Sequence, residues 1–275
     1  MKKVWFITGS SSGLGRSLTN EVLINGHIVV ATARDLQKNE DLAQRFGDQV
    51  HVLQLDVTDH ERIRQVVQEV IEKFGRIDVL VNNAGFGVTG ATEAFTPEQV
   101  QEQFAANLLA PIELCRNVIP HMRKQKSGRI INISSIGGRV TSMGLAIYQS
   151  AKFGLSGFSE ALSKEVAPLG IKVTAVEPGG IQTNWGGSSM TFAPHVEGYE
   201  ETVDTRVAFF QNGQFVAKSD PQKVAKVLID IAQEDEPPVH LVLGSDAAGV
   251  LNHTNSVREE EFQKWMPVTL STDAN

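Results

Sequence analysis

Cysteine, tyrosine and long apolar runs are scarce in this sequence. Cys115 is the only cysteine in 275 residues, so no disulfide can form within the chain and no thiolate cluster can bind a metal. The seven histidines are scattered without the paired spacing of metal ligands, and we expect no metal site. No apolar run approaches the ~20 residues that a membrane-spanning helix needs, and the run after Lys3 is too short for a secretory signal. These absences predict a soluble, cytoplasmic protein with no membrane partner.

An excess of positive charge is also missing. The chain has 25 basic and 32 acidic side chains and a net charge of −7, which argues against nucleic acid as a partner. Hydrophobic residues make up 41% of the sequence, enough for the core of one large α/β domain. We therefore expect a single domain over residues 1–275, with a core at 3–244, a substrate-loop region at 178–220 and a C-terminal extension at 245–275.

Short apolar runs alternate with longer segments of helical period. The runs are rich in valine and isoleucine, as in buried parallel strands, and lie at residues 3–8, 27–33, 51–56, 78–83, 128–134, 172–177 and 239–244. Between two of them, residues 60–74 carry apolar side chains on one face, with Asp59 as the expected N-cap. The alternation predicts a single Rossmann-like α/β fold, a doubly wound and mostly parallel seven-stranded sheet with helices on both faces.

Two segments depart from this alternation. Residues 178–220 carry glycine, polar and aromatic residues but no clear strand, which is typical of a lid or a binding loop. The last 25 residues show no strong period. Ligands of doubly wound sheets bind outside the carboxyl ends of the strands, where the strand order reverses. The residues just after each strand are therefore the candidates for a functional site.

A glycine-rich stretch follows the first predicted strand and precedes a helix: TGSSSGLGR, at residues 8–16. Gly9, Gly13 and Gly15 permit a tight turn and let the backbone approach a pyrophosphate, which then rests at the helix N-terminus. On its own such a stretch is also common in ordinary turns. Its place between the first strand and the first helix favours a dinucleotide site.

The spacing TGxxxGxG resembles that of the short-chain dehydrogenase/reductase family, and the other marks of that family follow in order. They are NNAG at residues 82–85, Asn107, Ser135, Tyr148 with Lys152, and PGG at residues 178–180. The resemblance covers residues 3–244 and implies an oxidoreductase that acts on CH–OH groups with NAD(P) as acceptor. Within the family, the chain looks most like ketoreductases and 17β-hydroxysteroid or retinol dehydrogenases.

The end of the second strand indicates which nicotinamide cofactor is preferred. Ala33 stands where an NAD-binding site usually has an acid, and Arg34 follows it. A guanidinium can bind a 2′-phosphate through two hydrogen bonds, so we expect NADP(H) to be preferred over NAD(H). Arg16 is a further candidate donor. Asp35 leaves an alternative open, since it can pair with Arg34 at the surface.

The resemblance carries the rest of the cofactor site onto this sequence. Asp56 would hold the adenine amino group and the backbone of Val57 would touch the ring, although Asp56 can instead cap a helix near Thr58. The Thr183 hydroxyl and nearby backbone groups would hold the nicotinamide carboxamide. The expected cofactor-binding set is Gly9, Ser11, Ser12, Gly13, Leu14, Gly15, Arg34, Asp56, Val57, Asn83, Ala84, Gly85, Tyr148, Lys152, Pro178, Gly179, Ile181 and Thr183.

Tyr148 and Lys152 are the expected centre of the chemistry. They lie four residues apart in a predicted helix and therefore share one face. A ketone that takes up hydride needs a proton on its oxygen, and a neighbouring cation lowers the pKa of a tyrosine that supplies it. Ser135 would hold the carbonyl oxygen; Ser134 is its rival, because neighbouring side chains of a strand point to opposite faces. By the resemblance, Asn107 would hold a water in a proton relay.

The expected substrate pocket is apolar and aromatic, with few fixed charges. Its expected members are Phe86, Ser135, Met143, Leu145, Gln149 and Trp185, together with part of residues 186–215. We therefore predict a bulky, uncharged, hydrophobic ketone or the corresponding secondary alcohol as substrate. The resemblance also implies a homodimer or homotetramer in which the helices around residues 98–126 and 148–167 pair.

Three other classes of protein stay open at this point. A catalytically silent NADP-binding regulator could share the fold, but it would not need Ser135, Tyr148 and Lys152. Epimerases and dehydratases that act on nucleotide sugars carry a distinct substrate domain, which this sequence does not show. A methyltransferase would have an acid at the end of the second strand and no tyrosine–lysine pair.

Overall fold

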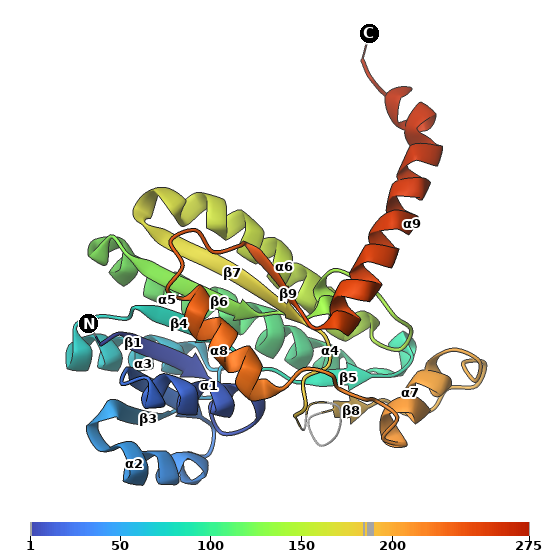
Figure 1. Cartoon of the computed structure of the whole chain (residues 1–275). Helices are drawn as coiled ribbons and strands as arrows, with labels where there is room; N and C mark the ends of the chain where they lie inside the picture. Colours follow the sequence, from blue (N-terminus) through green and yellow to red (C-terminus); the bar gives the residue numbers. More distant parts are fainter. Residues whose placement is uncertain (1, 184, 186–189, 275) are drawn as a thin grey trace.

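A parallel sheet forms the middle layer of the protein (Figure 1). The computed structural model describes residues 2–183, 185 and 190–274. The seven strands of the sheet follow the order β3-β2-β1-β4-β6-β7-β9, and all neighbours in it are parallel. They are β1 Val4–Thr8, β2 Ile28–Ala33, β3 Val50–Gln54, β4 Val79–Asn82, β6 Gly128–Ile133, β7 Ile171–Pro178 and β9 His240–Leu243. Each lies close to the bounds that the sequence predicts.

Helices cover both faces of this sheet. Their bounds are α1 Gly13–Ile24, α2 Glu40–Phe46, α3 His60–Phe74, α4 Pro97–Phe104, α5 Ala110–Gln125, α6 Ala146–Val166, α7 Val203–Gln211, α8 Pro221–Ile231 and α9 Ser245–Leu270. Successive side chains of β4 show why two layers are needed. Leu80 packs into the core under α3, α5 and α6, whereas Val81 packs into the core under α1 and α8. The predicted fold class is confirmed.

The strand order reverses between β1 and β4, in the middle of the sheet. From β1 the chain moves outward to β2 and β3, then returns to β4 on the other side of β1. α1 begins at Gly13, only a few residues after β1 ends at Thr8. The carboxyl ends of β1 and β4 and the N-terminus of α1 therefore meet at one place, where a doubly wound sheet binds its ligand.

Four elements were not predicted from the sequence. β5 (Gly87–Thr89) pairs in parallel with β8 (Met190–Phe192), so the expectation of no strand within residues 178–220 is wrong. α7 follows β8, and α9 occupies most of the C-terminal extension. Three-residue strands are too short to show a period. No helix in the described part of the chain is long and apolar enough to cross a membrane.

Candidate active site

A cleft of about 730 Å³ opens at the carboxyl ends of the central strands. Of the predicted cofactor residues, all but Gly15 line it, and so do the predicted catalytic residues Asn107 and Ser135. Most of these residues follow β1, β2, β3, β4, β6 and β7, and one cleft brings them together because parallel strands end at the same edge of the sheet. Tyr148 and Lys152 come from α6, and Asn107 from the turn between α4 and α5. Residues 186–189 of the predicted substrate segment lie outside the described residues.

The glycine-rich loop between β1 and α1 forms one wall of the cleft. Gly9 and Gly13 have φ angles of 66° and 54°, in the left-handed region that favours glycine. Gly15 lies behind the loop: a Cβ on it would come within 2.3 Å of the carbonyl oxygen of Gly9. Gly15 thus lets α1 start directly against the loop, and the first two residues of α1, Gly13 and Leu14, line the cleft. That arrangement fits a pyrophosphate.

Asn83 connects this loop to the end of β4. Its Nδ2 donates to the carbonyl oxygens of Thr8 (2.9 Å) and Gly9 (3.2 Å). The Thr8 hydroxyl in turn accepts from the backbone amides of Asn83 and Ala84, each at 3.0 Å. These four hydrogen bonds hold the floor of the cleft rigid where the strand order reverses.

Arg34 lies exposed at the rim of the cleft, at the end of β2. Asp35 is occupied elsewhere, because its side chain accepts from the backbone amide of Gln37 and caps a short 3₁₀ helix. No ion pair joins Arg34 to Asp35 in the described part of the chain. Arg16, the further candidate donor, forms an ion pair with Asp41 and donates to the carbonyl oxygen of Lys38. Arg34 is therefore the better placed of the two arginines.

Asp56 lines the cleft after β3, but it also has a local partner. Its Oδ1 accepts from the backbone amide (2.9 Å) and from the hydroxyl (2.8 Å) of Thr58. The N-cap of α3 is Asp59, as predicted, and its side chain accepts from the Arg62 amide. Asp56 is therefore not the cap of α3, and its carboxylate is held at the cleft by Thr58.

Tyr148, Lys152 and Ser135 meet at the other end of the cleft. Lys152 Nζ lies 5.9 Å from the centre of the Tyr148 ring and donates to the carbonyl oxygen of Ile133 at 2.9 Å. Ser135 directly precedes a 3₁₀ turn at Ile136–Gly138, and its hydroxyl accepts from the amide of Gly137. A hydrogen bond also joins the hydroxyls of Ser135 and Tyr148. α6 and β6 thus present an acid, a cation and a hydroxyl to one point.

Burial governs the titration of this pair before any cofactor binds. It raises the pKa of Tyr148 to about 12, against the smaller lowering effect of the hydrogen bond from Ser135. It lowers the pKa of Lys152 to about 8. The expectation that the cation lowers the tyrosine pKa is therefore wrong for the protein without cofactor. Both side chains are almost fully buried, and the ammonium is directed to the Ile133 carbonyl.

Asn107 lies in a π-helical turn, Ala105–Leu109, between α4 and α5. Its Nδ2 donates to the carbonyl oxygens of Phe86 (3.1 Å) and Gln103 (3.2 Å). Its Oδ1 is buried and has no hydrogen-bond partner among the described residues. A Cβ on Gly85 would lie 2.5 Å from that oxygen and 3.8 Å from Lys152 Nζ. The free acceptor and the ammonium therefore flank the same point beside Gly85.

The hydrogen bonds of Ser134 distinguish it from Ser135, the other candidate for the serine that holds the carbonyl oxygen. Its hydroxyl lies 2.9 Å from the Ser156 hydroxyl and donates to the backbone carbonyl of Lys152 at 3.2 Å. Ser156 in turn donates to Glu177. Ser134 also lines the cleft, but its hydroxyl is used to tie β6 to α6, and Ser135 is the serine that forms a hydrogen bond with Tyr148.

Glu177, which the sequence reasoning missed, is the fully buried centre of this network. Its carboxylate meets Arg139 at 3.1 Å, Ser156 at 3.1 Å and His240 at 2.8 Å. A buried carboxylate needs such partners to offset the loss of solvation. It joins the turn after Ser135, helix α6 and the edge strand β9 directly before Pro178. The sequence signal that could have revealed Glu177 is an acidic residue at the end of a mostly apolar strand, in VTAVEPGG at residues 173–180.

Asp246, at the start of α9, is a second residue that the sequence reasoning missed. Its Oδ2 accepts from the backbone amide of Gly180 at 2.8 Å. A Cβ on Gly179 would come within 2.4 Å of the same carboxylate, so the Pro178–Gly180 turn needs glycine there. The first turn of α9 thereby positions the loop that the resemblance assigns to the nicotinamide.

Aromatic rings form the outer wall beside Tyr148. The Trp185 ring lies 5.3 Å from the Tyr148 ring and 6.4 Å from the rings of Phe210 and Phe215. Trp185 and Phe215 line the cleft, as does Phe86. Phe215 was not among the predicted pocket residues. The wall is apolar next to the proposed proton donor.

Three predicted pocket residues do not line the cleft. Met143 is exposed on the surface, whereas Leu145 is buried under the start of α6. Gln149 is buried and turned back, since its Oε1 accepts from the Ser142 amide and its Nε2 donates to the Ser142 hydroxyl. Closeness in sequence to Tyr148 does not set the direction of a side chain, and a substrate role for these three stays a prediction.

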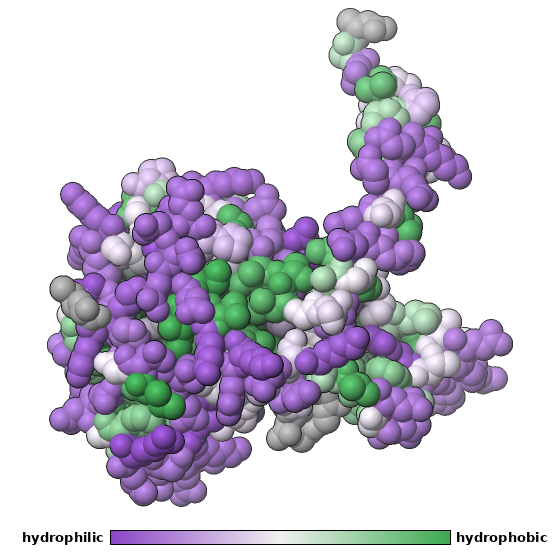
Figure 2. All heavy atoms as spheres, in the orientation of Figure 1, coloured by the Kyte–Doolittle hydropathy of each residue, from purple (hydrophilic) through white to green (hydrophobic). Residues whose placement is uncertain are grey.

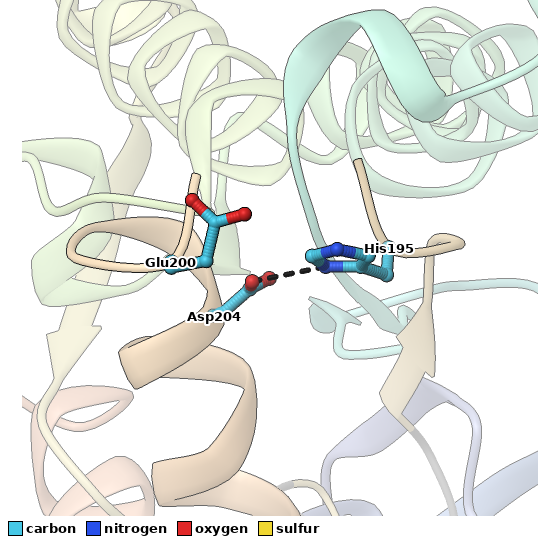
Figure 3. Close-up of side chains that lie close together, drawn as sticks. All are labelled: His195, Glu200 and Asp204. Carbon is cyan, nitrogen blue, oxygen red and sulfur yellow. Dashed lines mark ion pairs between the residues drawn. The ribbon is translucent and has the colours of Figure 1, made fainter. Parts of the chain in front are cut away.

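A side-chain group with the composition of a metal site lies apart from the residues that line the cleft, between β8 and α7 (Figure 3). His195, Glu200 and Asp204 place their nearest ligand atoms within 4.8 Å of one another, and His195 Nδ1 is 3.0 Å from Asp204 Oδ2. The group is at the surface, and Glu200 also accepts from the Gly198 amide. An exposed ion pair accounts for these contacts, and the expectation of no metal site stays a prediction.

Comparison with known proteins matches both the sequence and this geometry. The short chain dehydrogenase family model matches residues 3–192. Oxidoreductase BOA17 of Botryotinia fuckeliana is 41% identical over 99% of this chain and 100% of its own length. The 3-ketodihydrosphingosine reductase of Bacteroides thetaiotaomicron is 35% identical over 88% of each chain. The chain belongs to the short-chain dehydrogenase/reductase family, whose members are oxidoreductases that act on CH–OH groups.

Solved structures of other proteins also match the fold of this chain over most of its length. A short-chain dehydrogenase from Streptomyces avermitilis superposes with a TM-score of 0.93 and 38% identity over 100% of both chains, α9 included. ElxO with NADP bound has a TM-score of 0.75 at 28% identity, over 90% of this chain and 100% of its own. A 3-ketoacyl-(acyl-carrier-protein) reductase from Brucella melitensis, complexed with NADH, has a TM-score of 0.74 at 25% identity, over 88% of this chain and 96% of its own. Structural relatives thus bind either nicotinamide cofactor.

Proposed function

We propose that the protein is an NADPH-dependent carbonyl reductase that interconverts a hydrophobic ketone and its secondary alcohol. One observation carries the proposal. Tyr148, Lys152 and Ser135 lie at one end of a single cleft, and the glycine-rich loop and Arg34 lie at the other. A dinucleotide with its phosphates at the loop would extend along this cleft toward Tyr148.

The bound cofactor would supply hydride to the carbonyl carbon, and the residues of this chain would manage the oxygen. The Tyr148 hydroxyl donates the proton that turns the oxygen into an alcohol, while Ser135 donates a hydrogen bond to the same oxygen. Lys152 places a positive charge beside the phenol and stabilises the phenolate that is left. The free Oδ1 of Asn107 accepts from a water that returns a proton toward Lys152.

The aromatic wall supports the choice of substrate. Trp185, Phe210 and Phe215 pack against one another next to Tyr148, and rings of this kind bury apolar substrate surface without demanding a hydrogen bond. Arg34 supplies a positive charge at the adenosine end, where a 2′-phosphate would lie. The proposed division is therefore a charged end for the cofactor and an apolar end for the substrate.

Absorbance at 340 nm with purified protein tests the reaction. We expect NADPH to be consumed with a panel of bulky uncharged ketones, more slowly with NADH, and alcohol to form in equal amount. If NADPH bound, as seen in its fluorescence, while no ketone or alcohol of the panel turned over, the protein would be the NADP-binding regulator that the sequence left open.

Replacing Arg34 by alanine tests the cofactor preference. A charge-assisted hydrogen bond to a phosphate is worth about 1.5–3 kcal/mol, and Arg34 is exposed, so we expect the KM for NADPH to rise about tenfold, at the lower end of that range. The KM for NADH should change little, since NADH lacks the phosphate. Arg45→Ala, an exposed arginine that does not line the cleft, is the control. Equal effects of Arg34→Ala on both cofactors would make Arg34 a plain surface charge.

A further inference from the structure

The turn that follows β7 lies at the end of the cleft where the proposed reaction takes place. Strands β6 and β7 are neighbours in the sheet, and Ile133 pairs with Val176. Ser135 and Pro178 each lie two residues beyond this pair, so they reach the edge of the sheet side by side. The turn at Pro178–Gly180 lines the cleft. A hydride donor has to lie beside the carbonyl group that Ser135 and Tyr148 hold, so the reactive ring of the cofactor would lie along this turn.

The carboxylate of Asp246 lies directly behind the turn. Its Oδ2 accepts from the backbone amide of Gly180 at 2.8 Å. A Cβ on Gly179 would lie 2.5 Å from Oδ1 of Asp246, and so would a Cβ on Gly244. Asp246 itself does not line the cleft, whereas Gly179 and Gly180 do. Only the backbone of two glycines therefore separates this carboxylate from the cleft.

No basic side chain neutralises Asp246 within the described ranges, since none of the ion pairs found there includes it. Its Oδ1 is buried and accepts no hydrogen bond from any described residue. The other acid beside the turn, Glu177, differs because it pairs with Arg139 and His240. Apolar side chains gather around the base of α9, where Asp246 lies (Figure 2). Screening by water is weak at such a place, so the charge acts on its neighbours.

Support of the turn alone does not explain why residue 246 is an acid. One hydrogen bond to the Gly180 amide needs only a neutral oxygen, which asparagine also has. A buried carboxylate oxygen that lacks a donor costs free energy. The N-terminus of α9 offsets part of this cost, because it favours an acid in the first turn. What the carboxylate adds at this position is a negative charge behind the nicotinamide end of the cleft.

We propose that Asp246 stabilises the oxidised, positively charged nicotinamide over the reduced, neutral one. This inference rests on the proposed function. In that reaction the hydride leaves the reduced ring for the carbonyl carbon, and Tyr148 gives its proton to the oxygen. The ring is then left with one positive charge and Tyr148 with one negative charge. The Asp246 carboxylate attracts the positive charge through the turn and so favours hydride donation, which is the direction of ketone reduction.

The affinities for the two redox forms of the cofactor test this role without turnover. We expect Asp246→Asn to raise the Kd for NADP⁺ about tenfold, the size of a partly screened charge interaction, and the Kd for NADPH by less than about twofold. Isothermal titration calorimetry measures both. The ratio of the two Kd values is decisive, because a loosened turn would weaken both forms alike. Asp230→Asn is the matched control, since Asp230 is an exposed acid of α8 that does not line the cleft.

A second neutral variant guards against a local effect of the asparagine. Asp246→Ser also removes the charge, and serine is well tolerated at the start of a helix, so it should shift the ratio in the same direction. Circular dichroism checks that the variants are folded. An unchanged ratio in both neutral variants, or an equal loss of affinity for both forms, would overturn the inference and leave Asp246 as a support of the turn. If the unchanged protein bound neither form, the proposed function itself would be wrong, and this inference with it.

Discussion

Tyr148→Phe is expected to lower kcat for ketone reduction by about 10²–10⁴-fold, the range typical of a lost general acid. Phenylalanine keeps the ring against Trp185 and Lys152 but has no proton to donate. Because the pKa of Tyr148 is raised to about 12, the unchanged side chain is a neutral acid throughout the physiological pH range. The affinity for NADPH should stay nearly the same, since the loop, the Asn83 bonds and Arg34 are untouched.

The chain offers a matched control for this variant in its only other tyrosine. Tyr199 is exposed and forms a hydrogen bond with Glu93, away from the residues that line the cleft. Tyr199→Phe removes the same hydroxyl and should leave kcat unchanged. Single-turnover rates at saturating NADPH, with fluorescence titration of the cofactor, separate chemistry from binding. Normal turnover by Tyr148→Phe would disprove the proposed role of the tyrosine.

Much of the fold could be predicted because buried parallel strands have a strong signal. The runs of valine and isoleucine in β1, β2, β4 and β6 are apolar on both faces, and the helices between them have a polar face. β5 and β8 have three residues each and therefore no period to recognise. α9 went unrecognised because its apolar side chains, such as Phe262 and Trp265, are exposed and do not gather on one face of the helix.

The predictions for the candidate site likewise agree with the structure where the sheet sets a residue's position and disagree where other contacts set it. Residues that follow a strand directly, such as Ser135 and Asn83, were placed correctly in the cleft, because the sheet alone decides where they lie. Met143 and Gln149 were not, because a turn and a local hydrogen bond set their directions. Glu177 was missed because its three partners come from segments far apart in the sequence. Such contacts depend on packing, which no local pattern reports.

Lys152→Met is expected to have the second largest effect, a loss of about 10²-fold or more in kcat for reduction. Methionine keeps an unbranched side chain of similar length but no charge, so the phenolate left after proton donation loses its stabilising cation. The ammonium also holds the carbonyl oxygen of Ile133, two residues before Ser135. Lys164→Met is the matched control, since Lys164 lies exposed on the same helix and pairs only with Glu160 among the described residues.

The pH dependence separates the charge of Lys152 from its packing. Burial lowers the pKa of Lys152 to about 8, so the side chain is charged below that pH and becomes neutral above it. Tyr148 stays protonated across the same range because its pKa is about 12. The kcat/KM for reduction, which reports the groups of the free enzyme, should therefore fall as the pH rises through about 8, and the residual kcat/KM of Lys152→Met should show no such step. A step of equal size in the variant would assign the titration to another group and leave Lys152 with a packing role alone.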